Sequence, residues 1–218
     1  MKQHIYILIL IISLLSISSK TYSQVDIAVR NINRGIELCD EGKHHIGLFY
    51  LSIGLRNEEL PDSLRNIGEL YRQCSYIITD KEKVSNDILE NVLPQIKEPS
   101  YLLIYANQHL GQFYTQQEKF AKAHLYLNQS LQECERIGRK DSIEYVWNLI
   151  DLARLAIKQG KYDETNNLHQ QAYNLLKGNE TYKDAFMYLL SEFYHNNYMY
   201  LHNYNEALNI AKESSNVT

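Results

Sequence analysis

Histidine is the side chain in this sequence best suited to binding a metal ion, and its spacing does not favour a metal site. His44 and His45 are adjacent near the start of a predicted helix, where successive side chains point apart, and no third ligand stands nearby. His195 and His202 stand seven residues apart on one helix, too far along its axis to share one ion easily. The sequence therefore predicts no metal site and no cofactor.

Signatures of the common catalytic sites are absent as well. The chain contains no HExxH, GxSxG, GxGxxG or GxxxxGK[ST] motif. Cys39, Cys74 and Cys134 form no CxxC pair, and three thiols are too few for a disulfide scaffold. We expect these cysteines to be small buried core residues, and we expect the protein not to be an enzyme.

Tyrosine and asparagine offer binding chemistry instead. The chain has 18 tyrosines, and Tyr194 and Tyr198 stand one helical turn apart with Asn197 between them. A stripe of this kind suits an extended peptide, because tyrosine supplies broad contact and asparagine can bond a backbone amide. The alternative interpretation is that these rings form interhelical core.

Few helix breakers interrupt the chain, which predicts that the elements carrying these side chains are helices. There are 3 prolines and 9 glycines in 218 residues. Around Gly160, apolar residues recur at spacings of three and four on both sides, and Gly160 itself can take the left-handed conformation that ends a helix. The segment 155–176 is therefore predicted to be an αα-hairpin, with Tyr162 filling the gap between its helices.

This hairpin recurs along the chain. Tyr204 stands 42 residues after Tyr162, and Phe120 stands 42 residues before it. The earlier copy also carries Leu110, Gly111 and Tyr114 in a Leu-Gly-x-x-Tyr pattern, which resembles the tetratricopeptide repeat. The resemblance implies an all-α fold, a right-handed α-solenoid of about five helix-turn-helix hairpins. We expect the hairpins at about 25–57, 62–94, 99–137, 141–177 and 181–214.

A solenoid of this kind has a concave face lined by the first helix of each hairpin, and the positions expected there are polar or aromatic. These positions form the predicted peptide-binding surface. They are Tyr105, Gln108, Gln112, Asn148, Asp151, Arg154, Tyr194, Asn197 and Tyr198.

The first 23 residues have the layout of a signal peptide. Lys2 precedes an apolar run, and Thr21 and Ser23 fit a small-x-small cleavage site. The apolar run is shorter than a spanning helix needs, although an uncleaved N-terminal membrane anchor remains an alternative. We therefore expect a periplasmic or secreted protein whose mature part, residues 24–218, has no stable membrane span.

The net charge of −4 makes nucleic acid and anionic membrane poor partners, so a protein or peptide is the expected partner. The leading hypothesis is an exported protein-protein interaction scaffold that binds a peptide or a partner helix in its concave groove. The last hairpin has no further capping helix in this sequence, which would allow a homo-oligomer through that hairpin.

The leader followed by long repeats resembles the exported tetratricopeptide-repeat proteins of the Bacteroidota. In that group such repeats commonly precede a transmembrane helix and a cytoplasmic output part. The resemblance therefore implies an alternative function, the sensory part of a longer signalling regulator, a transcription factor or histidine kinase, without its output domain.

Overall fold

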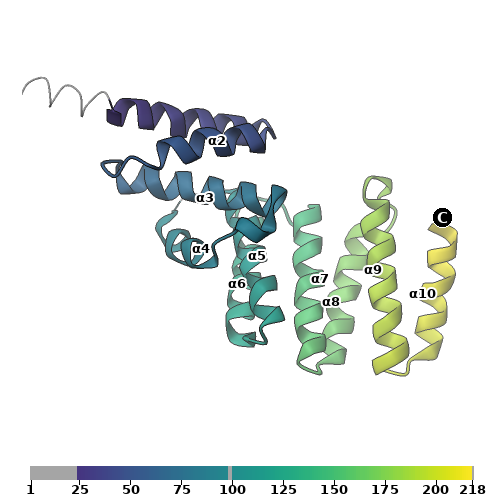
Figure 1. The fold of residues 1–218 in the computed structure, drawn as a ribbon. Coiled ribbons are helices and arrows are strands. Elements are labelled where there is room, and N and C mark those ends of the chain that lie inside the picture. Colours follow the sequence, from purple (N-terminus) through teal and green to yellow (C-terminus); the bar gives the residue numbers. More distant parts are fainter. Residues whose placement is uncertain (1–23, 98–99, 218) are drawn as a thin grey trace, which may run out of the picture. The chain divides into compact units, whose positions relative to one another are not determined.

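The computed structural model describes residues 24–97 and 100–217, and all regular structure within these residues is helical. The predicted all-α class is confirmed, whereas the predicted leader, residues 1–23, lies outside the described residues. The first helix covers residues 24–40. The α-helices that follow are α2 (His44–Gly54), α3 (Asp62–Thr79), α4 (Asn86–Val92), α5 (Tyr101–Gln116), α6 (Phe120–Arg136), α7 (Ile143–Lys158), α8 (Tyr162–Leu176), α9 (Lys183–His195) and α10 (Tyr204–Val217) (Figure 1). Short 3-10 segments are η1 (Lys81–Lys83), η2 (Leu93–Gln95) and η3 (Glu180–Tyr182), and η4 (Asn196–Tyr200) is a π-helix.

The helices fall into two compact units, residues 1–97 and 98–218. In the first unit, the helix over residues 24–40 packs on α2 around a buried apolar cluster. Close approach of these two helices depends on glycine, because a Cβ atom at Gly54 would lie 2.7 Å from Cγ1 of Ile32. The cluster consists of Ala28, Ile32, Cys39, Leu51, Leu55 and Leu60.

The second unit consists of three helical hairpins, α5–α6, α7–α8 and α9–α10, which lie side by side in chain order (Figure 1). The turn of the middle hairpin follows the prediction. Gly160 has φ +72, and the amide of Lys161 donates to the carbonyl of Ala156 at 2.9 Å, which closes the end of α7. The main apolar core lies between α7, α8, α9 and α10, around Phe186, Leu189 and Phe193.

Small residues bring the two helices of a hairpin together, as the sequence predicts. Ala123 and Ala153 are fully buried, and Ala207 is 2% exposed. The repeat pattern predicts that Tyr114 and Tyr204, like Tyr162, fill gaps between helices. This prediction holds for Tyr114, which is buried, but it is wrong for Tyr204, which is 57% exposed. The ring of Tyr204 contacts Tyr198 edge-on, and no later helix in the described part packs over it.

The prediction for the cysteines is confirmed. Cys39, Cys74 and Cys134 are all buried. Burial raises the pKa of the Cys134 thiol to about 11, so this side chain is protonated and unreactive at neutral pH.

Candidate protein-interaction surface

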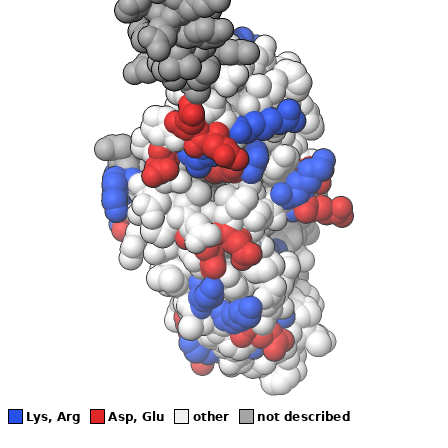
Figure 2. All heavy atoms as spheres, turned by 60° about the vertical axis from the view of Figure 1, so that its left-hand side comes forward, with Lys and Arg blue, Asp and Glu red and all other residues white. Residues whose placement is uncertain are grey.

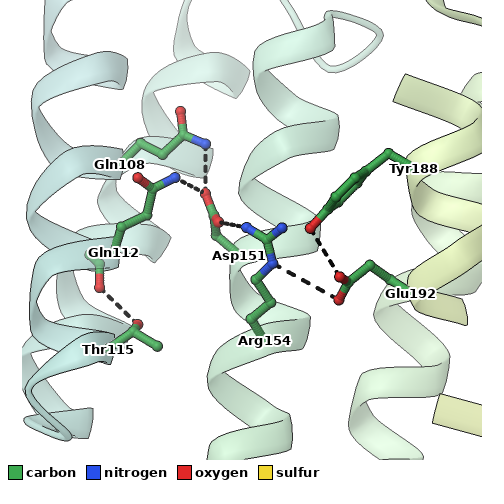
Figure 3. A network of polar contacts seen from close by, with 8 residues as sticks. Gln108, Gln112, Thr115, Asp151, Arg154, Tyr188 and Glu192 are labelled. Atoms are coloured by element: carbon green, nitrogen blue, oxygen red, sulfur yellow. Dashed lines mark hydrogen bonds and ion pairs between the residues drawn. The ribbon is translucent and has the colours of Figure 1, made fainter. Parts of the chain in front are cut away.

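Asp151 is the centre of a polar network that joins α5 to α7 (Figure 3). Its Oδ2 atom accepts hydrogen bonds from Nε2 of Gln108 and from Nε2 of Gln112, both at 2.7 Å. Gln108 and Gln112 stand one turn apart on α5, so their side chains lie on the same face of that helix. These two hydrogen bonds therefore hold the glutamine side chains of α5 in position against α7.

The carboxyl group of Asp151 is only 4% exposed, and its pKa reflects that burial. Loss of solvation raises the pKa above its ordinary value, while the bonds from Gln112 and Gln108 and the charge of Arg154 act in the opposite direction. Nη1 of Arg154 lies 3.2 Å from Oδ1 of Asp151. Asp151 is thus a buried acceptor whose two oxygens are both used.

Arg154 extends the network from α7 to α9 (Figure 3). Its Nε atom lies 4.0 Å from Oε2 of Glu192, and its guanidinium lies 5.1 Å from the centre of the Tyr188 ring. The hydroxyl of Tyr188 donates to Oε1 of Glu192 at 2.9 Å, and the ring of Trp147 lies 5.5 Å from that of Tyr188. The first helices of all three hairpins therefore contribute to one connected surface.

We refer to this region as the three-helix surface. It comprises Gln108 and Gln112 from α5, Trp147, Asp151 and Arg154 from α7, and Tyr188 and Glu192 from α9.

Tyr105 makes a second link from α5 to α7. Its hydroxyl donates to Oε1 of Glu144 at 3.2 Å. Burial, with the neighbouring charge of Glu144, raises the pKa of Tyr105 to about 12, so the phenol remains a donor at neutral pH. Asn148, one turn after Glu144, is fully buried and donates to the Glu144 carbonyl at 2.9 Å.

The remaining predicted residues lie near the end of α9, outside the network. Tyr194 and Tyr198 are 38% and 45% exposed, and their rings stack at 5.6 Å. Asn197 is fully buried in η4, where its Nδ2 atom donates to Oδ1 of Asn166 on α8. The structure thus brings Gln108, Gln112, Asp151 and Arg154 together, with Tyr105 beside them. Tyr194, Asn197 and Tyr198 form a separate group.

Because Asn148 and Asn197 have no exposed surface, neither presents its amide to solvent in this structure. Peptide contact by any of the nine residues stays a prediction.

Sequence reasoning did not single out Trp147, Tyr188, Glu192 or Glu144. A signal for two of them was present, because Tyr105, Trp147 and Tyr188 follow one another at intervals of 42 and 41 residues, which is close to the repeat spacing. An aromatic residue at the same place in successive repeats marks an equivalent position in each repeat.

Charged side chains are interspersed on the face shown in Figure 2, where Lys and Arg alternate with Asp and Glu among mostly uncharged atoms. Within residues 24–97 and 100–217, no three His, Cys, Asp or Glu side chains are grouped so that they could hold a metal ion. No helix of the described part is both long and apolar enough to cross a membrane.

Comparison with known proteins finds a family match over part of the chain. Residues 101–178 match the family model of the tetratricopeptide repeat. No curated protein sequence matches the chain.

Solved structures with the same fold include BtubC (BKLC) from P. vanneervenii, with a TM-score of 0.65 at 12% identity, covering 90% of each chain. MamA AMB-1 gives a TM-score of 0.60 at 17% identity, covering 87% of this chain and 90% of that chain. A putative kinesin light chain from Podosopora anserina with nearly identical TPR-like repeats gives a TM-score of 0.58 at 14% identity, covering 91% of this chain and 95% of that chain.

Proteins built from such repeats are generally scaffolds without catalytic activity. Residues 101–178 of this chain match tetratricopeptide repeats, and the chain has the all-helical fold of these solved repeat structures.

Proposed function

We propose that the three-helix surface binds a segment of another protein, either an extended peptide or a single helix, and leaves that segment chemically unchanged. The observation that carries this proposal is the position of Arg154, which is 39% exposed while it is held between Asp151 and Glu192 and over the Tyr188 ring. A cation held in this way is available to a partner and loses little conformational freedom on binding.

The residue types on the surface support the same proposal. Tryptophan, tyrosine and arginine are enriched where proteins bind one another and carry much of the binding energy. Trp147, Tyr188 and Arg154 provide all three types within one set of contacts. Gln108 and Gln112 place carboxamide groups beside them, and carboxamides can bond the backbone of an extended segment.

The place of action is part of the proposal. The signal-peptide layout of residues 1–23 supports export to the periplasm or out of the cell. A scaffold at that location would meet its partner outside the cytoplasm.

Selection from a random peptide library displayed on phage, with residues 24–218 as the target, tests this function. We expect enriched peptides whose affinity, measured by calorimetry, falls at least about tenfold in Trp147→Ala, since central aromatic residues dominate interface energies. The matched control is Gln129→Ala on the outer side of α6, which should bind the peptides as the unmodified protein does. Failure to enrich any peptide, or equal affinity for Trp147→Ala, would contradict the proposal.

A further inference from the structure

Two hydrogen-bond acceptors on α7 have no partner in the part of the chain that the structure describes. Oε2 of Glu144 and Oδ1 of Asn148 are both buried and both lack a hydrogen bond. Glu144 and Asn148 stand one turn apart on α7, so their side chains are neighbours on one face of that helix, and the Asn148 amide donates to the backbone carbonyl of Glu144. Buried acceptors are nearly always bonded in proteins, so this pair of oxygens is an exception that needs a reason.

No cation of the described residues forms an ion pair with the Glu144 carboxylate, although the charge of Arg139 acts on Tyr105 beside it. The only bond to this carboxylate from a side chain is the one that Tyr105 donates to Oε1, and no ion pair reaches it within the described residues. Arg139, which precedes α7 in the chain, lies over the ring of Tyr101 instead, 4.8 Å from its centre.

The charges along this side of α7 and α9 point to a positively charged ligand. Asp151 and Glu192 share the single guanidinium of Arg154, and Glu144 adds a third carboxylate without another cation. A positive group from a partner would complete the pairing of Glu144.

We propose that the protein segment bound by the three-helix surface inserts a lysine side chain, whose ammonium group bonds Oε2 of Glu144 and Oδ1 of Asn148. This inference rests on the proposed function, because the lysine belongs to the bound segment. An ammonium group has three donors on one compact atom, which suits two acceptors on side chains one helical turn apart. Both acceptor oxygens are buried in the unbound structure, so this binding requires the Glu144 side chain, which is only partly buried as a residue, to rotate when the segment binds.

The test uses the peptides selected on residues 24–218, each made with its lysine intact or replaced by norleucine, which has the same length and no charge. Trp147 is the only tryptophan in the chain and stands next to Asn148, so its fluorescence reports binding. We expect norleucine to weaken binding about 10-fold or more, as for other hydrogen bonds to a charged group. Glu144→Gln should weaken the lysine peptide to a similar extent while changing the affinity of the norleucine peptide less than about twofold.

A further variant is the control for binding. Glu135→Gln on α6 changes an exposed carboxylate that pairs with Lys140 and lies outside the surface, so it should leave both affinities unchanged. A loss of affinity in Glu135→Gln equal to that in Glu144→Gln would overturn the inference.

The outcomes distinguish this inference from the proposed function. Suppose that the selected peptides bind Trp147→Ala more weakly than the unmodified protein. The lysine site is then wrong, and the three-helix surface stands, if replacing lysine by norleucine leaves the affinity unchanged. The same holds if Glu144→Gln weakens the lysine peptide and the norleucine peptide equally. If no peptide is selected, or Trp147→Ala binds all of them normally, both are overturned.

Discussion

Asp151 is the residue on which the three-helix surface most depends. It is buried, and it accepts bonds from two glutamines of α5 and from Arg154 of its own helix. Removal of a buried acceptor leaves its donors unsatisfied, which costs more than the bonds themselves are worth. The same side chain therefore holds two hairpins in register and holds Arg154 in position for a partner.

Replacement of Asp151 tests that role. Asp151→Ala should lower the free energy of unfolding by about 2 to 4 kcal/mol, since it leaves a partly buried guanidinium and two amide groups without an acceptor. Glu135→Ala, which removes an exposed carboxylate paired with Lys140, should cost less than about 1 kcal/mol. Urea unfolding at pH 7 measures both values, and equal losses would contradict the central place of Asp151.

His169 on α8 is a second unusual residue. It is fully buried against Phe193, and neither ring nitrogen has a hydrogen-bond partner in the described part of the chain. Burial, and to a lesser degree the charge of Arg154, lowers the pKa of His169 to about 4. The folded protein therefore holds this histidine neutral.

The sign of the pH dependence follows from that lowered pKa. In the unfolded chain the pKa is about 6.5, so the unfolded state binds a proton between about pH 6.5 and pH 4 that the folded state does not. The contribution of neutral His169 to the free energy of unfolding is fully present above the pKa of the unfolded state. It is lost as the pH falls from that value towards the pKa of the folded state. His169→Leu cannot bind the proton, so it should escape this loss.

Unfolding in urea at pH 7 and pH 5 measures the effect. The unmodified protein should lose about 2 kcal/mol more between these pH values than His169→Leu loses. An equal loss in the two proteins would show that His169 is hydrogen-bonded or solvated in solution.

At the scale of the elements, the closeness of α5 and α6 is set by Gly111. A Cβ atom at this position would lie 2.5 Å from Cγ and Cδ2 of Leu127, which is fully buried. Gly111→Ala should therefore destabilise the protein by about 1 to 3 kcal/mol through overpacking, although alanine favours a helix.

A double substitution identifies the cause of that loss. Leu127→Val shortens the side chain that the new methyl group meets, so combining it with Gly111→Ala should cost less than the sum of the two single effects. Thermal melts of the single and double variants provide the comparison. If the loss of stability in the double variant equals the sum of the two single losses, the strain does not arise from contact between the new methyl group and Leu127.

The repeat pattern explains how much of these elements could be predicted. Regular spacing on α5 and α7 sufficed to place Gln108, Gln112, Asp151 and Arg154 on one side, because both helices are α-helical throughout. Gly111 of the Leu-Gly-x-x-Tyr pattern lies at the close contact between α5 and α6.

The end of α9 could not be predicted in the same way. Residues Asn196–Tyr200 form a π-helix, in which each turn holds more residues than an α-turn, so counting by three and four fails there. Asn197 is consequently buried against α8, and the exposed rings of Tyr194 and Tyr198 lie near Tyr204 of α10. Hydrogen-bonded side-chain pairs such as Tyr188 and Glu192 also leave no mark in a single sequence.

At the scale of the whole molecule, two apolar clusters of the described residues each lie within one unit. One cluster spans residues 28–60 and another spans residues 146–210, on either side of the division after Lys97. A unit with its own core can fold alone. The fragment 98–218 should therefore keep its helical circular-dichroism signal and unfold in one cooperative transition, and a fragment without cooperative unfolding would show that it needs residues 1–97.

Site-specific crosslinking in the cells that make the protein tests the central claim, that partners bind the three-helix surface. A photoreactive benzoylphenylalanine replaces Gln112 on α5 in one variant and Gln129 on the outer side of α6 in another. After illumination and immunoblotting, we expect a discrete larger species from the variant at position 112 and none from the variant at position 129. Crosslinking only from position 129, or from neither position, would contradict the claim.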